Sequence, residues 1–307
     1  MTLTKTENSR RVLNRAPLLA LLLGVIAVST ASTFIRLAQQ EVSSLSVAAW
    51  RLTFATLILA PFALFKCRDH WRKLDRNRWL LLTVSGIVLA VHFYTWITSL
   101  ALTSVAASTV LVATNPLFVG LISHFFLGDR LTRSVLTGLI VAIAGSVLIG
   151  ISGVGQGTHQ LAGDLLALTG ALAVAIYLLI GRRLRAELPL LAYIFPVYGM
   201  AAAVLMGMAL ILGTPLGSYT PTAWLWLVLV ALVPQILGHS SFNWALGHFP
   251  ATYVALAALT EPVGSTLLAW TVLQEPPPLI TVIGGSLTLI GIGIALRRPP
   301  RTRRKNA

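Results

Sequence analysis

The sequence predicts an all-α, polytopic membrane protein with ten transmembrane helices, built as two inverted five-helix repeats. Three observations lead to this fold class. The 307-residue chain is 56% apolar and 10% charged, and its mean hydropathy is +0.82. Its apolar residues fall into ten runs of membrane-spanning length. The two halves of the chain also share unusual residues at a constant offset.

The low share of charged residues indicates which solvent surrounds the protein. A soluble globular domain carries about 25% charged residues, so the 10% found here cannot cover a water-exposed surface. We therefore expect lipid around most of the chain. At about 20 residues per span, a chain of 307 residues accommodates ten spans with short connections and no separate soluble domain.

The ten apolar runs define the predicted spans and the domain boundaries. Most of the connections between them are short and rich in Gly, Pro and Ser. The runs cover residues 17–38, 45–65, 79–101, 104–126, 132–151, 161–181, 188–213, 222–246, 250–273 and 278–296. Residues 1–16 form a basic N-terminus, 17–151 the first five-helix repeat, 161–296 the second repeat, and 297–307 a basic tail.

Basic residues mark one side of the predicted bundle. With ten spans, all of the 23 lysines and arginines except Arg36 and Arg51 fall on a single side. Cytoplasmic loops are enriched in these residues, so we expect the bacterial inner membrane, with the N- and C-termini in the cytoplasm. The net charge of +14 is then a topology signal. It predicts the lipid bilayer as a partner and no nucleic acid.

No cofactor and no metal are expected. The single cysteine, Cys67, excludes an internal disulfide and a multi-cysteine metal site. The sequence also lacks an ATP-binding loop, a metal-binding spacing and a nucleophile elbow. We therefore do not expect the protein to be an enzyme.

The internal repeat is clearest around two prolines inside predicted spans. Thr114-Asn115-Pro116 aligns with Thr260-Glu261-Pro262 at an offset of 146 residues, the separation of the two prolines. An acid follows each proline after 13 residues, Asp129 in the first half and Glu275 in the second. Five spans per repeat is an odd number, so the halves must insert in opposite orientations. Inverted repeats of this kind are typical of many secondary transporters.

These residues carry a resemblance to a known family. The segments from Glu261-Pro262 to Leu273-Gln274-Glu275 and from Asn115-Pro116 to Leu127-Gly128-Asp129-Arg130 resemble motifs of the EamA-type drug/metabolite transporter superfamily. The resemblance covers the whole chain, and the sequence is most similar overall to bacterial aromatic amino-acid exporters of the YddG type. It implies a mid-membrane cavity formed by the first, third, fourth, sixth, eighth and ninth spans. Asn115 replaces an acid often seen in the family, so the two halves are not chemically equivalent.

Glu261 is the most informative candidate residue. A charged carboxylate near the middle of a span costs about 2.5–3.5 kcal/mol on insertion scales. We therefore expect Glu261 to face a water-filled cavity, to pair with a donor or to stay protonated. The functional interpretation is a substrate or proton site, and the alternative is a buried acid that caps a helix kinked at Pro262.

Aromatic and polar residues in the third and eighth spans predict the rest of the pocket. Helical spacing places His92, Trp96 and Ser99 near one face, and likewise His239 and Asn243. Such faces combine ring stacking with hydrogen bonds, as an aromatic amino acid requires. The alternatives are anchoring at the membrane interface and polar packing between helices. With Tyr177 and Asn115 at mid-membrane depth, the predicted substrate-binding residues are His92, Trp96, Ser99, Asn115, Tyr177, His239, Asn243 and Glu261.

Four further residues are assigned a structural or gating role: Arg36, Arg51, Pro116 and Pro262. Both arginines lie near the non-cytoplasmic ends of their predicted spans. We expect Arg51 either to extend its side chain outwards to the interface or to pair with Glu41 or Asp164.

The leading functional hypothesis is a secondary transporter that exports aromatic or other neutral amino acids and related metabolites by alternating access. Proton coupling and facilitated diffusion both remain open. A broad-specificity efflux pump for drugs or cations is the alternative within the same class, with Glu261 as its acid. A non-transporting membrane receptor or an enzyme is the alternative of another class. A monomer is expected, because an inverted repeat encloses its own cavity.

Overall fold

The computed structural model describes residues 15–127, 133–152, 158–249, 254, 257–258 and 260–296. Within these residues the chain is helical, and its elements are α2 (Arg15–Ser29), α3 (Ala31–Ala38), α4 (Ser44–Lys66), α5 (Arg68–Arg72), α6 (Arg76–Leu102), α7 (Val105–Val112), α8 (Asn115–Leu127), α9 (Arg133–Ser152), α10 (Thr158–Arg185), α11 (Leu190–Ile211), α12 (Pro221–Val230), the π-helix η1 (Ala231–His239), α13 (Ser240–Ala245), α15 (Glu261–Leu273) and α16 (Leu279–Leu296). The predicted basic tail, most of the basic N-terminus and the Gly128-Asp129-Arg130 motif lie outside the described residues.

Seven helical segments are long and apolar enough to cross a membrane: Leu19–Ala38, Ser44–Lys66, Arg76–Leu102, Val105–Ile122, His159–Arg185, Leu190–Ile211 and Pro221–Ala245. Two shorter apolar helices cover Leu136–Gly145 and Leu279–Ile294. The prediction of an all-helical chain with several helices of membrane-spanning length is therefore confirmed over the described part of the chain. The count of ten spans in an inverted repeat stays a prediction.

Side-chain caps explain where several of these helices begin. The Ser43 hydroxyl accepts a hydrogen bond from the Ser46 amide at 3.2 Å, and the Ser104 hydroxyl accepts one from Ala107 at 3.1 Å. The Asp75 carboxylate does the same for the Arg78 amide at 2.8 Å at the start of α6. Each cap satisfies a backbone donor that has no partner in the first turn of its helix.

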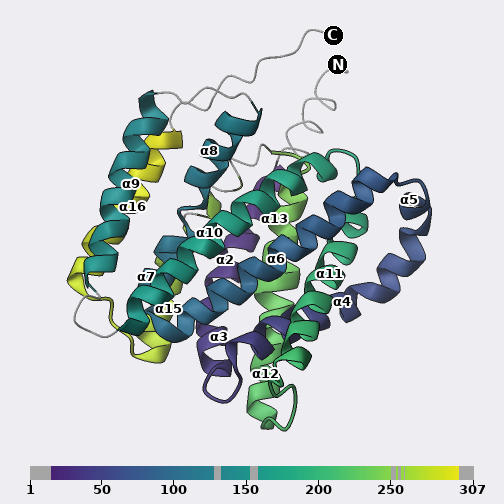
Figure 1. Cartoon of the computed structure of the whole chain (residues 1–307), viewed down its shortest axis with the longest axis horizontal. Helices are drawn as coiled ribbons and strands as arrows, with labels where there is room; N and C mark the ends of the chain where they lie inside the picture. Colours follow the sequence, from purple (N-terminus) through teal and green to yellow (C-terminus); the bar gives the residue numbers. More distant parts are fainter. Residues whose placement is uncertain are drawn as a thin grey trace, which may run out of the picture.

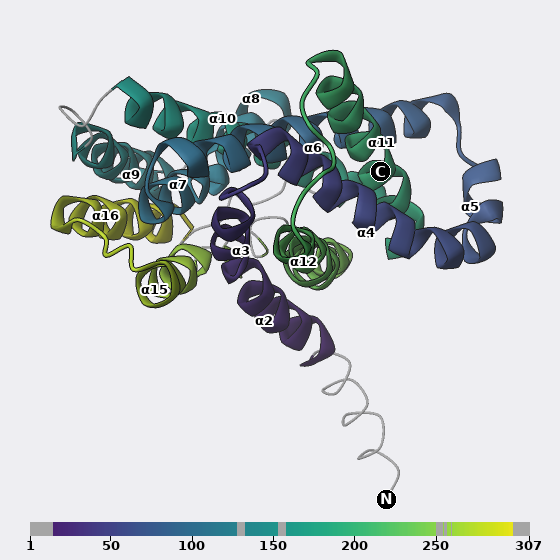
Figure 2. The same ribbon diagram turned by 90° about the horizontal axis from the view of Figure 1, so that it is seen from below.

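The helices pack in pairs that join distant parts of the chain. α9 lies against α16, α6 against α10, and α4 against α11. Figures 1 and 2 show α9 and α16 side by side at one flank of the molecule, with α4 and α11 at the opposite flank. α6 and α10 run between the two flanks and carry much of the buried core.

Three of the predicted spans are interrupted rather than continuous. The first divides at Thr30 into α2 and α3, the fourth divides between Val112 and Asn115, and the eighth contains the π-helix η1. Pro116 explains the second break, because proline lacks the amide proton that would continue the ladder. At the first break, the Thr30 hydroxyl donates to the Ala27 carbonyl at 2.7 Å. Such hydrogen bonds from a side chain back to the helix often bend it.

The two ends of the bundle have different connections. At one end, named here the Glu275 end, lie the connections 39–43, 103–104, 212–220 and 274–278. The Ser46 hydroxyl and the Trp50 indole donate there to the Pro215 and Leu216 carbonyls at 2.6 and 3.0 Å. At the other end, named the Trp71 end, the Trp71 indole donates to the Ala192 carbonyl at 3.0 Å.

Candidate functional site

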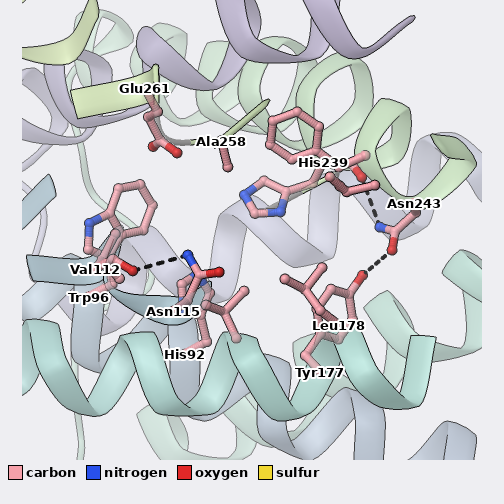
Figure 3. A pocket seen from close by; sticks show the side chains of 13 residues that line it. His92, Trp96, Val112, Asn115, Tyr177, Leu178, His239, Asn243, Ala258 and Glu261 are labelled. Carbon is pink, nitrogen blue, oxygen red and sulfur yellow. Dashed lines mark hydrogen bonds between the residues drawn. The ribbon is translucent and has the colours of Figure 1, made fainter. Parts of the chain in front are cut away.

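A small cavity of about 50 Å³ lies among α6, α7, α8, α10, η1, α13 and α15. Figure 3 shows side chains from these elements converging on it. Its lining is largely apolar with a few polar groups: His92, Trp96, Val112, Asn115, Val174, Tyr177, Leu178, His239, Phe242, Asn243, Val254, Ala258 and Glu261. An apolar concavity with a small number of placed polar groups is the usual form of a small-molecule site.

The structure brings seven of the eight predicted substrate-binding residues to this cavity. The exception is Ser99, which is buried next to α7. Its hydroxyl lies 2.7 Å from the Trp96 carbonyl and 2.6 Å from the Ser108 hydroxyl, so it joins α6 to α7. The prediction for Ser99 is corrected to a helix-packing position. None of the described lining residues comes from the first span, although the family resemblance implied one.

α6 supplies one wall through His92 and Trp96. Their rings stack with centroids 5.9 Å apart and an interplanar angle of 11°. The Nδ1 atom of His92 lies 2.9 Å from the Gly170 carbonyl of α10. Because a carbonyl oxygen only accepts, Nδ1 carries the proton in this contact. The Trp96 indole nitrogen is buried and has no hydrogen-bond partner among the described residues.

A hydrogen-bond network centred on Asn243 forms the opposite wall. The Tyr177 hydroxyl donates to the Asn243 Oδ1 atom at 2.8 Å (Figure 3). The Asn243 Nδ2 atom donates to the His239 carbonyl at 2.9 Å and to the Tyr198 hydroxyl at 3.3 Å. The network joins α10, α11 and α13 and fixes the orientation of the amide. Sequence reasoning missed Tyr198, although a polar group inside an apolar run was a signal for it.

Asn115 and Glu261 meet the cavity where their helices begin. Each is the first residue of its helix and is followed by proline, Pro116 in α8 and Pro262 in α15. A helix N-terminus carries a partial positive charge and unpaired amide groups, so these two starts add polarity to the site. Discontinuous helices of this kind form the binding sites of many transporters.

The two side chains at these helix starts are only partly satisfied. The Asn115 Nδ2 atom donates to the Val112 carbonyl at 3.2 Å, while its Oδ1 atom is buried without a partner among the described residues. The Glu261 carboxylate points into the cavity in Figure 3. No described residue forms a hydrogen bond with it.

Arg51 lies in the protein interior, which corrects the sequence prediction. Its side chain is fully buried, its Nε atom donates to the Gln235 Oε1 atom at 2.7 Å, and its guanidinium carbon lies 4.1 Å from the centre of the Phe93 ring. It therefore neither extends to the membrane interface nor pairs with the expected acids. Glu41 accepts a hydrogen bond from the Thr220 hydroxyl at 2.8 Å instead. The π-helix η1 supplies the competing partner, Gln235, which hydropathy does not reveal.

Arg36 has a different position, at the Glu275 end. Its guanidinium lies 3.1 Å from the Glu275 carboxylate and donates to the Leu100 carbonyl at 2.7 Å. Both side chains are partly exposed. Among the described residues there is no group of three His, Cys, Asp or Glu side chains that could hold a metal ion.

Comparisons with known proteins identify the class of the molecule. A curated "uncharacterized transporter" of Archaeoglobus fulgidus is 26% identical and covers 87% of this chain and 94% of its own. The "pseudopaline exporter CntI" of Pseudomonas aeruginosa is 29% identical over 90% of this chain and 95% of its own. A "probable terminal-alkyne amino-acid exporter" of Streptantibioticus cattleyicolor is 27% identical over 64% and 66%.

A solved structure and a family match agree with these relatives. The solved crystal structure shares the fold with a TM-score of 0.66 at 22% identity, covering 92% of this chain and 96% of its own. The sequence pattern of the EamA-like transporter family matches the chain twice, over residues 15–151 and again over residues 161–297. With nearly the whole length matched, the protein belongs to the EamA-like transporter family and is a membrane transporter for a small molecule.

Proposed function

We propose that the protein is a secondary transporter that exports aromatic or other neutral amino acids and related metabolites by alternating access. The observation that carries the proposal is the combination of groups around the cavity. The rings of His92, Trp96 and His239 lie in the same space as the amide of Asn115 and the carboxylate of Glu261. An apolar ring and a polar amino-acid group then each find a matching surface.

The named relatives support export, and the name of one of them supports an amino acid as the substrate. One carries the name of an exporter of pseudopaline, and another the name of a probable exporter of a terminal-alkyne amino acid. The first matches 90% of this chain and the second 64%. The aromatic lining is the feature of this chain that favours ring-bearing amino acids over others.

Two inverted five-helix halves would supply the alternating access. The packing of α9 on α16 supports this arrangement. These are the last helices of the two halves, and equivalent helices that contact each other are expected where a two-fold axis relates the halves. The Thr288 hydroxyl lies 3.4 Å from the Ala142 carbonyl, and these two residues are separated by the repeat offset of 146. The breaks at Asn115 and Glu261 fall at the same place in each half, beside the cavity.

The orientation and the location follow from the basic residues. The Trp71 end carries the basic side chains of α5 and its flanks together with the arginines at the end of α10. Cytoplasmic loops are rich in Lys and Arg, so this end faces the cytoplasm of a bacterial inner membrane, with both termini on the same side. The working unit is a monomer, because the cavity is formed within one chain.

The opposite end, the Glu275 end, would then face the outside, and the contacts that close it would form the outer gate. Arg36 on α3 bonds both the end of α6 and Glu275, and the Glu275 carboxylate accepts the Val105 amide of α7 at 2.8 Å. These contacts join α3, α6 and α7 of the first half to the connection after α15 in the second half. Opening towards the outside requires that they separate, which gives Arg36 its gating role.

A second function, efflux of lipophilic cations, is favoured by one observation. The Glu261 carboxylate faces the cavity without a hydrogen-bonded cationic partner among the described residues. A carboxylate in an apolar site attracts a weakly hydrated cation, because such a cation loses little hydration energy on entering the site. Cation efflux depends on this negative charge alone. Transport of a neutral amino acid depends on both the negative charge and the aromatic walls of the cavity.

Flux measurements with purified protein in liposomes separate the two functions. We expect saturable flux of labelled tryptophan, phenylalanine and methionine, reduced at least tenfold by His92→Ala and unchanged by His70→Ala on the exposed helix α5. Glu261→Gln, with Asp69→Asn as its exposed control, tests the acid. Flux of a lipophilic cation alone, lost in Glu261→Gln, would replace the proposal with drug efflux. No flux of any substrate would refute transport of these compounds.

A further inference from the structure

Arg51 is a buried cation whose hydrogen bonds are incomplete. It is fully buried, and its Nε atom bonds to Gln235, but its Nη1 and Nη2 atoms have no hydrogen-bond partner among the described residues. The Gln235 Nε2 atom is likewise buried without a described partner. Leaving a charge buried and unpaired is costly, and natural interiors usually pair such a group with an acid. A role in helix packing alone does not explain why the charge is retained.

The groups around Arg51 are mostly neutral. Its guanidinium lies 4.1 Å from the centre of the Phe93 ring and 5.8 Å from that of Trp96, both on α6. η1 contributes Gln235 and His239, and α11 contributes Tyr198. Among the described residues, the carboxylate that interacts electrostatically with Arg51 is that of Glu261, on α15, and the two groups form no ion pair. Arg51 and Glu261 are therefore a separated cation and anion.

The charge of Arg51 reaches the cavity. His92 and His239, which both line it, experience the positive charge of Arg51. Trp96 connects Arg51 to the cavity, because it is part of the cavity lining and the centre of its ring lies 5.8 Å from the Arg51 guanidinium. Charges interact strongly over such distances in an interior of low dielectric constant. The α6 wall is thus the electropositive side of the cavity, and Glu261 is its electronegative group.

We propose that Arg51 is a specificity-determining residue that selects substrates bearing a carboxylate. The substrate is a zwitterionic α-amino acid, with its carboxylate towards the α6 wall and its ammonium group towards Glu261. This inference rests on the proposed amino-acid export and adds to it the basis of discrimination. A ligand with an ammonium group but no carboxylate would be repelled by the positive charge of Arg51, with no attraction to offset the repulsion. We expect such a ligand to be rejected for that reason.

The test compares tryptophan with tryptophanamide, which has nearly the same shape but no carboxylate. Flux of both is measured in liposomes containing the intact protein. We expect the wild type to prefer tryptophan by about tenfold or more. Arg51→Met, which removes the charge and keeps much of the volume, is expected to lose most of this preference. Arg51→Lys and Gln235→Leu, which keep a positive charge at the site, are expected to retain it.

Several outcomes would overturn the inference. One is equal flux of both compounds through the wild type. This measurement does not depend on the folding of any variant. A second is an Arg51→Met protein that is folded and slower with both substrates by the same factor, since that is the result of a purely structural role. If the wild type moves neither compound, the proposed function itself fails. If it moves tryptophan with a preference that Arg51→Met leaves unchanged, only the role of Arg51 fails.

Discussion

The Arg36 guanidinium and the Glu275 carboxylate lie 3.1 Å apart and connect residues that are 239 positions apart in the chain. Arg36 also donates to the Leu100 carbonyl, and Glu275 accepts the amide of Val105. One ion pair therefore joins α3, the end of α6, the start of α7 and the connection after α15. The side chains are 31% and 24% exposed. A pair this exposed contributes about 0–1 kcal/mol to stability, so its effect lies in holding these elements together.

Breaking this pair is expected to open the Glu275 end. In a Cys67→Ser background, a cysteine introduced at Val112 in the cavity reports access to a membrane-impermeant maleimide added outside the cell. Arg36→Gln or Glu275→Gln should raise its labelling rate severalfold and change the melting temperature little, because the pair is partly exposed. Glu41→Gln, at the same end, is the control acid. Equal labelling rates in all three variants would show that the pair is not a gate.

Close packing of α9 on α16 depends on glycine. A Cβ atom on Gly291 would lie 2.6 Å from the Gly138 carbonyl oxygen, and one on Gly145 would lie 2.5 Å from that of Gly284. Glycines that allow two helices to approach closely are typical of membrane proteins. Gly293, on the same helix as Gly291, has no atom within 4 Å of such a Cβ.

Gly291→Ala is therefore expected to destabilise the fold by about 1–3 kcal/mol, the usual cost of overpacking. Gly293→Ala should leave stability unchanged within about 0.5 kcal/mol, as a substitution away from such contacts does. Melting temperatures in detergent, measured side by side, compare the two variants. Similar melting temperatures would contradict the tight α9–α16 contact.

Hydropathy located the helices well because it measures the property that the bilayer selects. The run predicted at 45–65 is observed as Ser44–Lys66, and that at 79–101 as Arg76–Leu102. It could not reveal the division of the first span at Thr30 or the π-helix within the eighth, since both breaks occur inside apolar sequence. Those breaks depend on particular hydrogen bonds, of the Thr30 hydroxyl in the first span and of the backbone in the π-helix, which an average over a window does not contain.

The cavity residues were predictable from two signals, polar side chains inside apolar runs and helical spacing. Helical spacing alone failed for Ser99, because a face of α6 that is shared with His92 can still be covered by α7. The expectation for Arg51, based on its place near the end of a predicted span, was wrong because the partner that holds its side chain inside, Gln235, is 184 residues away in the chain. Contacts of this range depend on the packing of the helices and not on local sequence.

The hydroxyl of Tyr177 is expected to matter through Asn243. Tyr177→Phe removes the donor at 2.8 Å and leaves the Asn243 Oδ1 atom buried and unsatisfied. The cost of such a group is about 1–3 kcal/mol, and the freed amide should also lower the affinity for substrate. Melting temperature and the concentration dependence of flux measure the two effects. Tyr94→Phe, on α6 and away from the network, is the control and should change neither.

Cys67, in the connection before α5, makes the orientation of the Trp71 end testable. Its side chain is 3% exposed, and burial raises the pKa of its thiol, while Lys66 acts in the opposite sense and more weakly. A raised pKa leaves less thiolate at neutral pH, and the thiolate is the reactive form. Labelling by a maleimide should therefore be slow at pH 7 and should accelerate as the pH rises past about 8.5, the ordinary value for cysteine.

A membrane-impermeant maleimide should label Cys67 in inside-out vesicles and not in intact cells, because this end is proposed to face the cytoplasm. Asp69→Cys in a Cys67→Ala background is the matched control: residue 69 is exposed on α5, so its thiol should react faster at pH 7 from the same side. Labelling of either cysteine in intact cells would invert the proposed topology. Equal rates for the two cysteines at pH 7 would instead leave the orientation standing and contradict the burial of Cys67.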